Sequence, residues 1–274
     1  MALVGRVIDM LPDGEPVRGM TTIDNCLYVL RANKSSEQIE VYDVDSFSLL
    51  RCISVPGLAN PADIVACEHN CCVYICSASQ HSVHKVLING TPTQWPVNDS
   101  PTCLSLTVNY NVLVACRKVC KIKEFTTDGQ LLRDVVLNVL SPWHAVQLSN
   151  GELIVCHGYF TEKLHRVCLI DSKGRLVKSY GGQLGSGNHL MNTPSHMAVD
   201  ENDFVFVVDR NNFRVLLLSP TLTYVREVLS PKQLQWQPYR VSVDVKRRRL
   251  YVAVNEHLKV GDYTAGRVIV VNMQ

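Results

Sequence analysis

The stretch from Pro194 to Ser219 reads PSHMAVDENDFVFVVDRNNFRVLLLS and contains three short apolar runs separated by two polar turns. The runs cover residues 197–199, 204–208 and 215–218. Runs of this length that are rich in Val and Phe, and that are bounded by Asp, Asn and Pro, are typical of strands and too short for most helices. The stretch therefore predicts three consecutive antiparallel strands, and weaker versions of the pattern occupy the rest of the chain.

A proline placed a few residues before an apolar pair recurs along the whole chain, at intervals of 40 to 52 residues. These prolines are Pro16, Pro61, Pro101, Pro142, Pro194 and Pro238. Three apolar runs follow each proline, and a fourth, more polar run follows all but the last set. Repeats of about forty residues, each a four-stranded meander, are typical of β-propellers. We therefore predict an all-β, six-bladed β-propeller that forms a single domain over residues 1–274.

The two ends of the chain complement each other. The last repeat stops at Gln274 after its third run, while a spare apolar run at residues 3–10 precedes the first proline. We expect this N-terminal strand to become the fourth strand of the last blade, with residues 1–11 closing the ring. Such closure removes a strand edge that would otherwise invite aggregation.

Composition bounds the class of protein. The chain has 46% hydrophobic and 19% charged residues and a net charge of +2, so it has no overall field that attracts nucleic acid or membranes. No apolar run approaches the roughly 18 residues that span a bilayer, and the N-terminus lacks the order of a signal peptide. We expect a cytoplasmic, monomeric protein that does not bind membranes. The odd number of cysteines, 11, without any CxxC pair predicts free thiols and no disulfides.

The fifth repeat and its lead-in resemble an NHL repeat, the propeller repeat found at the C-terminal end of many TRIM-type ubiquitin ligases. The matching residues are Tyr180-Gly181-Gly182, Gly185-Ser186-Gly187, Asn192-Thr193-Pro194-Ser195, Ala198-Val199-Asp200, Val208-Asp209-Arg210-Asn211-Asn212 and Arg214-Val215. The other repeats lack the Gly-rich lead-in and the complete Asp-x-x-Asn-x-Arg turn. The resemblance implies a propeller that binds macromolecules. Because the chain has no RING or B-box pattern, a role in ubiquitination would be that of a substrate receptor.

Residues two places after each recurrent proline should gather at the mouth of the central channel. They are Arg18, Asp63, Cys103, His144, His196 and Arg240. Four of these residue types are potential metal ligands, and this subset is Asp63, Cys103, His144 and His196. Two interpretations stay open: a metal-dependent enzyme of the lyase or lactonase type, and polar groups that are hydrated or bonded to one another. We expect no cofactor and assign no catalytic residue.

The turns between the second and third strands should share one face with that mouth. They carry basic and aromatic residues, which are Arg31, Lys34, Arg117, Lys118, Tyr159, Phe160, Lys163, Arg210, Arg214 and Tyr263. A mildly basic face with aromatic groups suits a protein partner or RNA. The densest basic run, Lys246-Arg247-Arg248-Arg249, falls in a turn on the opposite face and is typical of a solvated hairpin. The favoured function is a non-catalytic protein-binding module, with RNA binding on the same face and metal-dependent catalysis as the alternatives.

Overall fold

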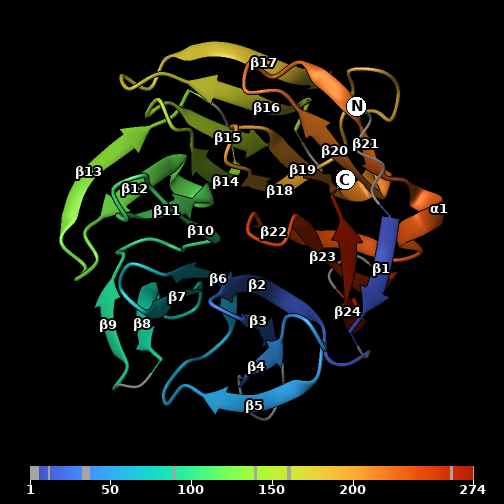
Figure 1. The fold of residues 1–274 in the computed structure, drawn as a ribbon. Coiled ribbons are helices and arrows are strands. Elements are labelled where there is room, and N and C mark those ends of the chain that lie inside the picture. Colours follow the sequence, from blue (N-terminus) through green and yellow to red (C-terminus); the bar gives the residue numbers. More distant parts are fainter. Residues whose placement is uncertain are drawn as a thin grey trace.

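The computed structural model describes residues 6–11, 13–32, 38–88, 91–138, 141–158, 162–259 and 262–273. Six four-stranded antiparallel sheets form a ring in which each sheet is one blade (Figure 1). The predicted six-bladed β-propeller is therefore confirmed. None of the described helices is long and apolar enough to cross a membrane.

The first three blades follow the chain in simple meanders. Their strands are β2 (Val17–Ile23), β3 (Cys26–Arg31), β4 (Gln38–Asp43) and β5 (Leu49–Ser54) in blade 1, β6 (Pro61–Cys67), β7 (Cys72–Ser77), β8 (Ser82–Leu87) and β9 (Thr93–Pro96) in blade 2, and β10 (Cys103–Leu106), β11 (Val112–Cys116), β12 (Lys121–Phe125) and β13 (Leu131–Val136) in blade 3. A short 3-10 helix, η1 (Arg117–Val119), joins β11 to β12.

The other three blades continue the ring. Their strands are β14 (Pro142–Gln147), β15 (Leu153–His157), β16 (Leu164–Ile170) and β17 (Leu176–Gln183) in blade 4, β18 (Pro194–Val199), β19 (Val205–Asp209), β20 (Arg214–Leu218) and β21 (Tyr224–Leu229) in blade 5, and β22 (Gln237–Asp244), β23 (Arg249–Lys259), β24 (Asp262–Asn272) and β1 (Arg6–Met10) in blade 6. The 3-10 helix η2 (Arg210–Asn212) joins β19 to β20, and α1 (Pro231–Leu234) connects blades 5 and 6.

Neighbouring blades pack face to face, which explains why the inner strands are apolar on both sides. Every residue of β7, β11, β15 and β19 is buried. An apolar cluster lies between each pair of adjacent blades, and blade 6 packs against blade 1 in the same way as the others. A sheet covered on both faces needs no polar face, so the second and third strands do not alternate.

The N-terminal strand closes the ring as predicted. Strand β1 pairs antiparallel with β24, with Val7 opposite Val271 and Met10 opposite Ile269, and the two strands lie side by side in Figure 1. The pairing continues beyond β1, because the amide of Leu11 donates to the carbonyl of Val268 at 2.9 Å. The predicted strand covered residues 3–10; residues 1–5 lie outside the described part of the chain.

The ring has two distinct faces because adjacent strands run antiparallel. The face with the starts of the first strands also carries the turns between second and third strands, and we call it the mouth face. The opposite face carries the turns between first and second strands, and we call it the turn face. The site predictions concern the mouth face, and the basic run of residues 246–249 lies on the turn face.

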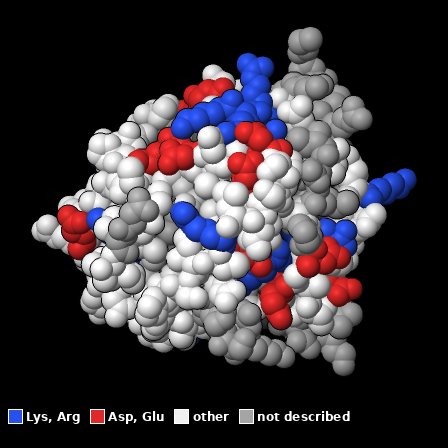
Figure 2. All heavy atoms as spheres, turned by 60° about the horizontal axis from the view of Figure 1, so that its bottom comes forward, with Lys and Arg blue, Asp and Glu red and all other residues white. Residues whose placement is uncertain are grey.

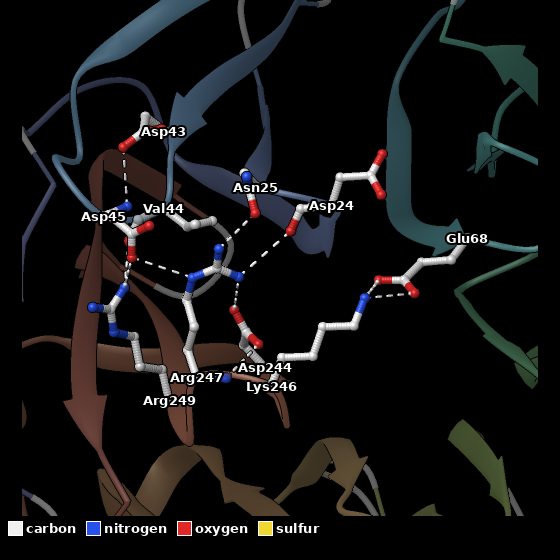
Figure 3. Close-up of polar contacts among 10 residues, drawn as sticks. All are labelled: Asp24, Asn25, Asp43, Val44, Asp45, Glu68, Asp244, Lys246, Arg247 and Arg249. Atoms are coloured by element: carbon white, nitrogen blue, oxygen red, sulfur yellow. Dashed lines mark hydrogen bonds and ion pairs between the residues drawn. The ribbon is translucent and has the colours of Figure 1, made fainter.

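The basic run is bonded to neighbouring blades (Figure 3). Lys246 forms an ion pair with Glu68 of blade 2 at 2.8 Å. Arg247 and Arg249 each form an ion pair with Asp45 of blade 1, at 3.2 and 3.3 Å. Exposed pairs of this kind contribute about 0–1 kcal/mol each, so they add modestly to the closure made by β1. The run is thus a set of contacts that connects the last blade to the first two.

Candidate functional site

A register shift near the start of the first strand aims the predicted mouth residues inward. The shift falls between the recurrent proline and the residue two places later in four blades, at Pro61/Asp63, Pro142/His144, Pro194/His196 and Pro238/Arg240. Proline cannot donate to the strand ladder and suits the first position of a strand, and a bulge after it re-aims the next side chain. The proline spacing that marked the blades in the sequence therefore also places the mouth residues.

Asp63 and Arg240 form a buried ion pair across the channel. The Nε atom of Arg240 lies 3.2 Å from Oδ1 of Asp63, and each side chain is 2% exposed. The other carboxylate oxygen, Oδ2, accepts a hydrogen bond from the amide of Leu104 in blade 3 at 3.0 Å. Arg240 also donates to the carbonyl of Ala62 at 2.9 Å. Burial by itself raises the pKa of Asp63, but Arg240 and then His196 outweigh it and hold that pKa well below its usual range.

Two buried histidines stack beside this pair. The rings of His144 and His196 have centroids 4.1 Å apart and are inclined by 8°. Nδ1 of His144 accepts from the amide of Met197 at 3.1 Å, so its Nε2 carries the proton donated to the carbonyl of Leu104 at 3.0 Å. Nδ1 of His196 likewise accepts from the amide of Val241, at 3.3 Å, and leaves its Nε2 proton facing Oδ2 of Asp63 at 3.5 Å.

Both histidines are neutral at ordinary pH. Burial is the main cause that lowers the pKa of His144, and its neighbour His196 lowers it further. Burial also lowers the pKa of His196, although the contact with Asp63 opposes that shift. Each ring bridges first strands of different blades, as Asp63 and Arg240 do. These side chains therefore join blades 2 to 6 around the channel, and we call them, Asp63, His144, His196 and Arg240, the mouth belt.

Cys103 completes the only set of potential metal ligands found among the described residues. One ligand atom each from Asp63, Cys103 and His196 lies within 4.8 Å of the others. The set fits a metal poorly, because the guanidinium of Arg240 already holds the carboxylate and would repel a cation. Burial also raises the pKa of Cys103 well above its ordinary value, which keeps a neutral thiol rather than the thiolate that binds metals. The structure thus supports mutual bonding within this cluster.

Arg18 lies close enough to Tyr239 to influence its pKa. Burial by itself raises the pKa of the Tyr239 phenol, but surrounding arginines outweigh it and lower that pKa. These are, in decreasing order of effect, Arg240, Arg210 and Arg18. The channel contains a cavity of about 290 Å³ whose walls are formed by the first strands and include Met20, Ile64 and Met197, together with His144 and His196 of the mouth belt.

Several residues of the predicted binding face serve the fold. Arg31 is 4% exposed, pairs with Glu40 at 2.6 Å and donates to the carbonyl of Gly266 in blade 6 at 2.8 Å. Arg210 is 8% exposed and donates to Gln237 at 3.0 Å. Lys118 and Lys163 are exposed on the mouth face. The predicted residues Lys34, Tyr159 and Phe160 lie outside the described residues.

The turn that resembles an NHL repeat is held by Asp209. Its buried carboxylate accepts from the amide of Asn192 at 2.7 Å, from the side chain of Asn212 at 2.8 Å and from Nε of Arg214 at 2.7 Å. Arg214 also donates to the carbonyl of Leu190 at 2.8 Å. The Asp-x-x-Asn-x-Arg motif therefore fixes the lead-in and η2, and its polar groups are engaged inside the blade.

The mouth face contains arginine–aromatic stacks, and not all of their members were predicted from the sequence. The guanidinium of Arg117 lies 4.5 Å from the ring centre of Trp143. That of Arg267 lies 3.7 Å from the ring centre of Trp236, and Arg210 lies near Tyr239 and Tyr263, at 5.1 and 5.6 Å. The predicted face included Arg117, Arg210 and Tyr263 but omitted the two tryptophans and Tyr239. Their position next to the recurrent prolines was the signal that could have found them.

The aromatic members of these stacks are partly exposed. Trp143, Trp236, Tyr239 and Tyr263 are each neither fully buried nor fully open to solvent. Basic and acidic side chains lie next to each other in the view of Figure 2. Half-buried aromatic rings with arginines against them are the feature of the mouth face that bears on binding.

Comparison with known proteins identifies similar folds but no activity for this chain. No family model and no curated protein matches the chain, so the NHL resemblance has no support from that side. The structure is similar to the PQQ-bound aldose sugar dehydrogenase of Streptomyces coelicolor, with a TM-score of 0.70, 13% identity and coverage of 98% of each chain. It is also similar to virginiamycin B lyase of Staphylococcus aureus, with a TM-score of 0.65, 10% identity and coverage of 97% of this chain and 100% of that one.

A third similar structure is the WD40 β-propeller domain of Doa1, with a TM-score of 0.64, 12% identity and coverage of 100% of this chain and 98% of that chain. The three proteins have differing functions according to their names, and identities this low show a shared fold alone. The function of this chain has to be argued from its own residues.

Proposed function

We propose that this protein is a non-catalytic propeller that binds a partner protein on its mouth face. The observation that supports this most directly is the group of half-buried aromatic rings stacked with arginines around the channel mouth. Trp, Tyr and Arg are the residue types that contribute most binding energy at protein interfaces, because they present large rigid contact areas with polar edges.

The region around η1 is an exposed part of this face. Lys118 and Val119 are exposed beside the Arg117–Trp143 stack, and Val119 is 41% exposed. An apolar side chain next to basic and aromatic groups suits a partner segment with both acidic and apolar residues. The NHL resemblance of the fifth repeat agrees with this class of function. In a ubiquitin-dependent pathway, the chain would act as a substrate receptor.

The alternatives receive less support from the geometry. Some arginines that a basic RNA-binding face would use are engaged inside the fold, including Arg31 and Arg214. Catalysis at the channel mouth would need accessible groups, but the mouth belt is buried and its members bind one another. The net charge of +2 also gives little of the single-sign field that accelerates encounter with nucleic acid.

A pull-down before and after nuclease treatment tests the proposal. The probe is the full chain, compared with the double variant Lys118→Glu/Val119→Asp on the mouth face. The matched control is Lys173→Glu, a charge reversal of an exposed lysine in the β16–β17 turn on the turn face. We expect nuclease-resistant capture of one partner protein by the parent and the control, and loss of that capture in the double variant. Capture that disappears with nuclease would instead indicate RNA, and equal capture by the double variant would place the interface elsewhere.

A further inference from the structure

A second cavity lies on the turn face, between blades 5 and 6 and away from the channel. Its volume is about 540 Å³, within the range of small-molecule sites. The walls include Phe204, Phe206, Leu217, Val225 and Met273, which are apolar. Val225 is 44% exposed, so the cavity opens to solvent at the outer strand of blade 5. An apolar ligand entering here would exclude water from these walls.

A single arginine in this wall lacks hydrogen-bonding partners. Arg226 in β21 contributes to the lining, and its Nε and Nη2 atoms are buried without a hydrogen-bond partner among the described residues. Burial lowers the pKa of its guanidinium. A buried polar group without a partner destabilises a fold, and a partly buried cation does so more. An anion bound in the cavity would supply the missing partner.

Comparison between blades shows why Arg226 is unpartnered. In blade 1, Tyr28, Val41 and Arg51 lie opposite one another on three adjacent strands. Burial raises the pKa of the Tyr28 phenol, and a side-chain hydrogen bond with Arg51 opposes that rise. In blade 1 the arginine of this row is thus within reach of the tyrosine hydroxyl on the second strand.

Blade 5 has the same row without the hydroxyl. Phe206 lies opposite Leu217, which lies opposite Arg226. In blade 3 the corresponding Arg133 is paired instead with Glu124, at 2.7 Å. Blade 5 offers neither a phenol nor a carboxylate in the row, so its arginine has no partner there and lines the cavity.

We infer that the turn-face cavity binds a small apolar monocarboxylate, with the apolar body against Phe206 and Leu217 and the carboxylate on Arg226. Arginine and carboxylate match in geometry and charge, and their hydrogen bonds are among the stronger ones in proteins. The other charged residues of the lining are Asp200, Glu201 and Arg248, and the two carboxylates disfavour ligands with several negative charges. This site is separate from the proposed mouth-face interface and does not depend on it.

Binding of 4-phenylbutanoate and decanoate by the purified full chain tests the inference. The neutral comparison ligand is 4-phenylbutanamide, which has the same shape around the apolar body but no charge. A hydrogen bond to a charged group is strong enough that the acid should bind at least about tenfold more tightly than the amide. Isothermal titration calorimetry measures the two affinities, and the thermal midpoint should rise with the acid because a ligand of the folded state stabilises it. Failure of both acids to bind at millimolar concentration, or equal binding of acid and amide, would overturn the inference.

Matched variants in the equivalent rows of blades 5 and 1 distinguish loss of the binding site from general effects of a substitution on folding or charge. Arg226→Met removes the charge, and its folding is expected to survive because the lost cation has no partner; acid binding should fall about tenfold or more while amide binding is kept. The matched control Arg51→Met makes the same change in blade 1 and should leave binding intact. Phe206→Tyr adds a hydroxyl where blade 1 has one, so it should occupy Arg226 and weaken acid binding. Undiminished acid binding in Arg226→Met or in Phe206→Tyr would contradict the assignment.

Discussion

The substitution Asp63→Asn is expected to destabilise the propeller strongly, because it leaves Arg240 charged and buried without its counter-ion. Both side chains of the pair are 2% exposed. Removing one partner of a buried ion pair costs about 3–5 kcal/mol, since the remaining charge is uncompensated. For a chain of this size class that corresponds to a fall of about 6–20 °C in the thermal midpoint.

Urea unfolding followed by circular dichroism measures this loss, with Asp45→Asn as the matched control. Asp45 also pairs with arginines, but its side chain is 64% exposed, so the same change should cost at most about 1 kcal/mol. The double variant Asp63→Asn/Arg240→Met removes both charges. It should cost clearly less than the sum of the two single changes, because neither charge is then left alone.

Two results would refute this reasoning. The first is an Asp63→Asn variant that lies within about 1 kcal/mol of the Asp45→Asn control, which would mean that the pair is solvated in solution. The second is strict additivity in the double variant, which would mean that Asp63 and Arg240 act independently.

Two further predictions concern acid and ring closure. Because burial lowers the pKa values of His144 and His196, the unfolded chain takes up protons below about pH 6.5 that the folded chain does not. At about pH 5, stability should therefore fall by at most about 2 kcal/mol for His144 and by less for His196, whose contact with Asp63 opposes the lowering. A urea midpoint that stays constant from neutral pH to this value would contradict the neutral assignment. Deletion of residues 1–11 exposes the edge of β24 and should lower the thermal midpoint and the solubility, measured by scanning calorimetry and light scattering against a truncation that stops before β1. A β1-deleted chain that melts like the parent would show that β1 contributes little to closure.

Much of the architecture was predictable because its signals are local and repeated. Each blade carries a proline, buried strand runs and a polar outer strand, and their order in the chain is also their order in the ring. The incomplete last repeat and the spare N-terminal strand predicted closure for the same reason. The mouth positions of Asp63, His144, His196 and Arg240 followed from the spacing to the prolines, since equivalent positions meet at the axis of a closed ring.

The partners of those positions were beyond the sequence. Asp63 and Arg240 are 177 residues apart and come into contact only because the ring closes. The exposure of residues on the predicted binding face was also beyond the sequence. Lys118 and Arg31 are both basic residues at the connections between second and third strands, but Lys118 is exposed and Arg31 is buried. Whether a basic side chain stays exposed or forms internal hydrogen bonds depends on the carboxylates and carbonyls around it. These groups come from other strands and blades.

The amino-acid sequence alone determined the number of blades, the closing strand and the residues that surround the channel, because those depend on a periodic pattern of burial. Only the tertiary structure decided which charged groups are satisfied. Arg51 and Arg226 occupy the same place in two blades, yet one meets a tyrosine hydroxyl and the other faces a cavity. Charge is a property of the residue, whereas its compensation depends on atoms brought close by the fold.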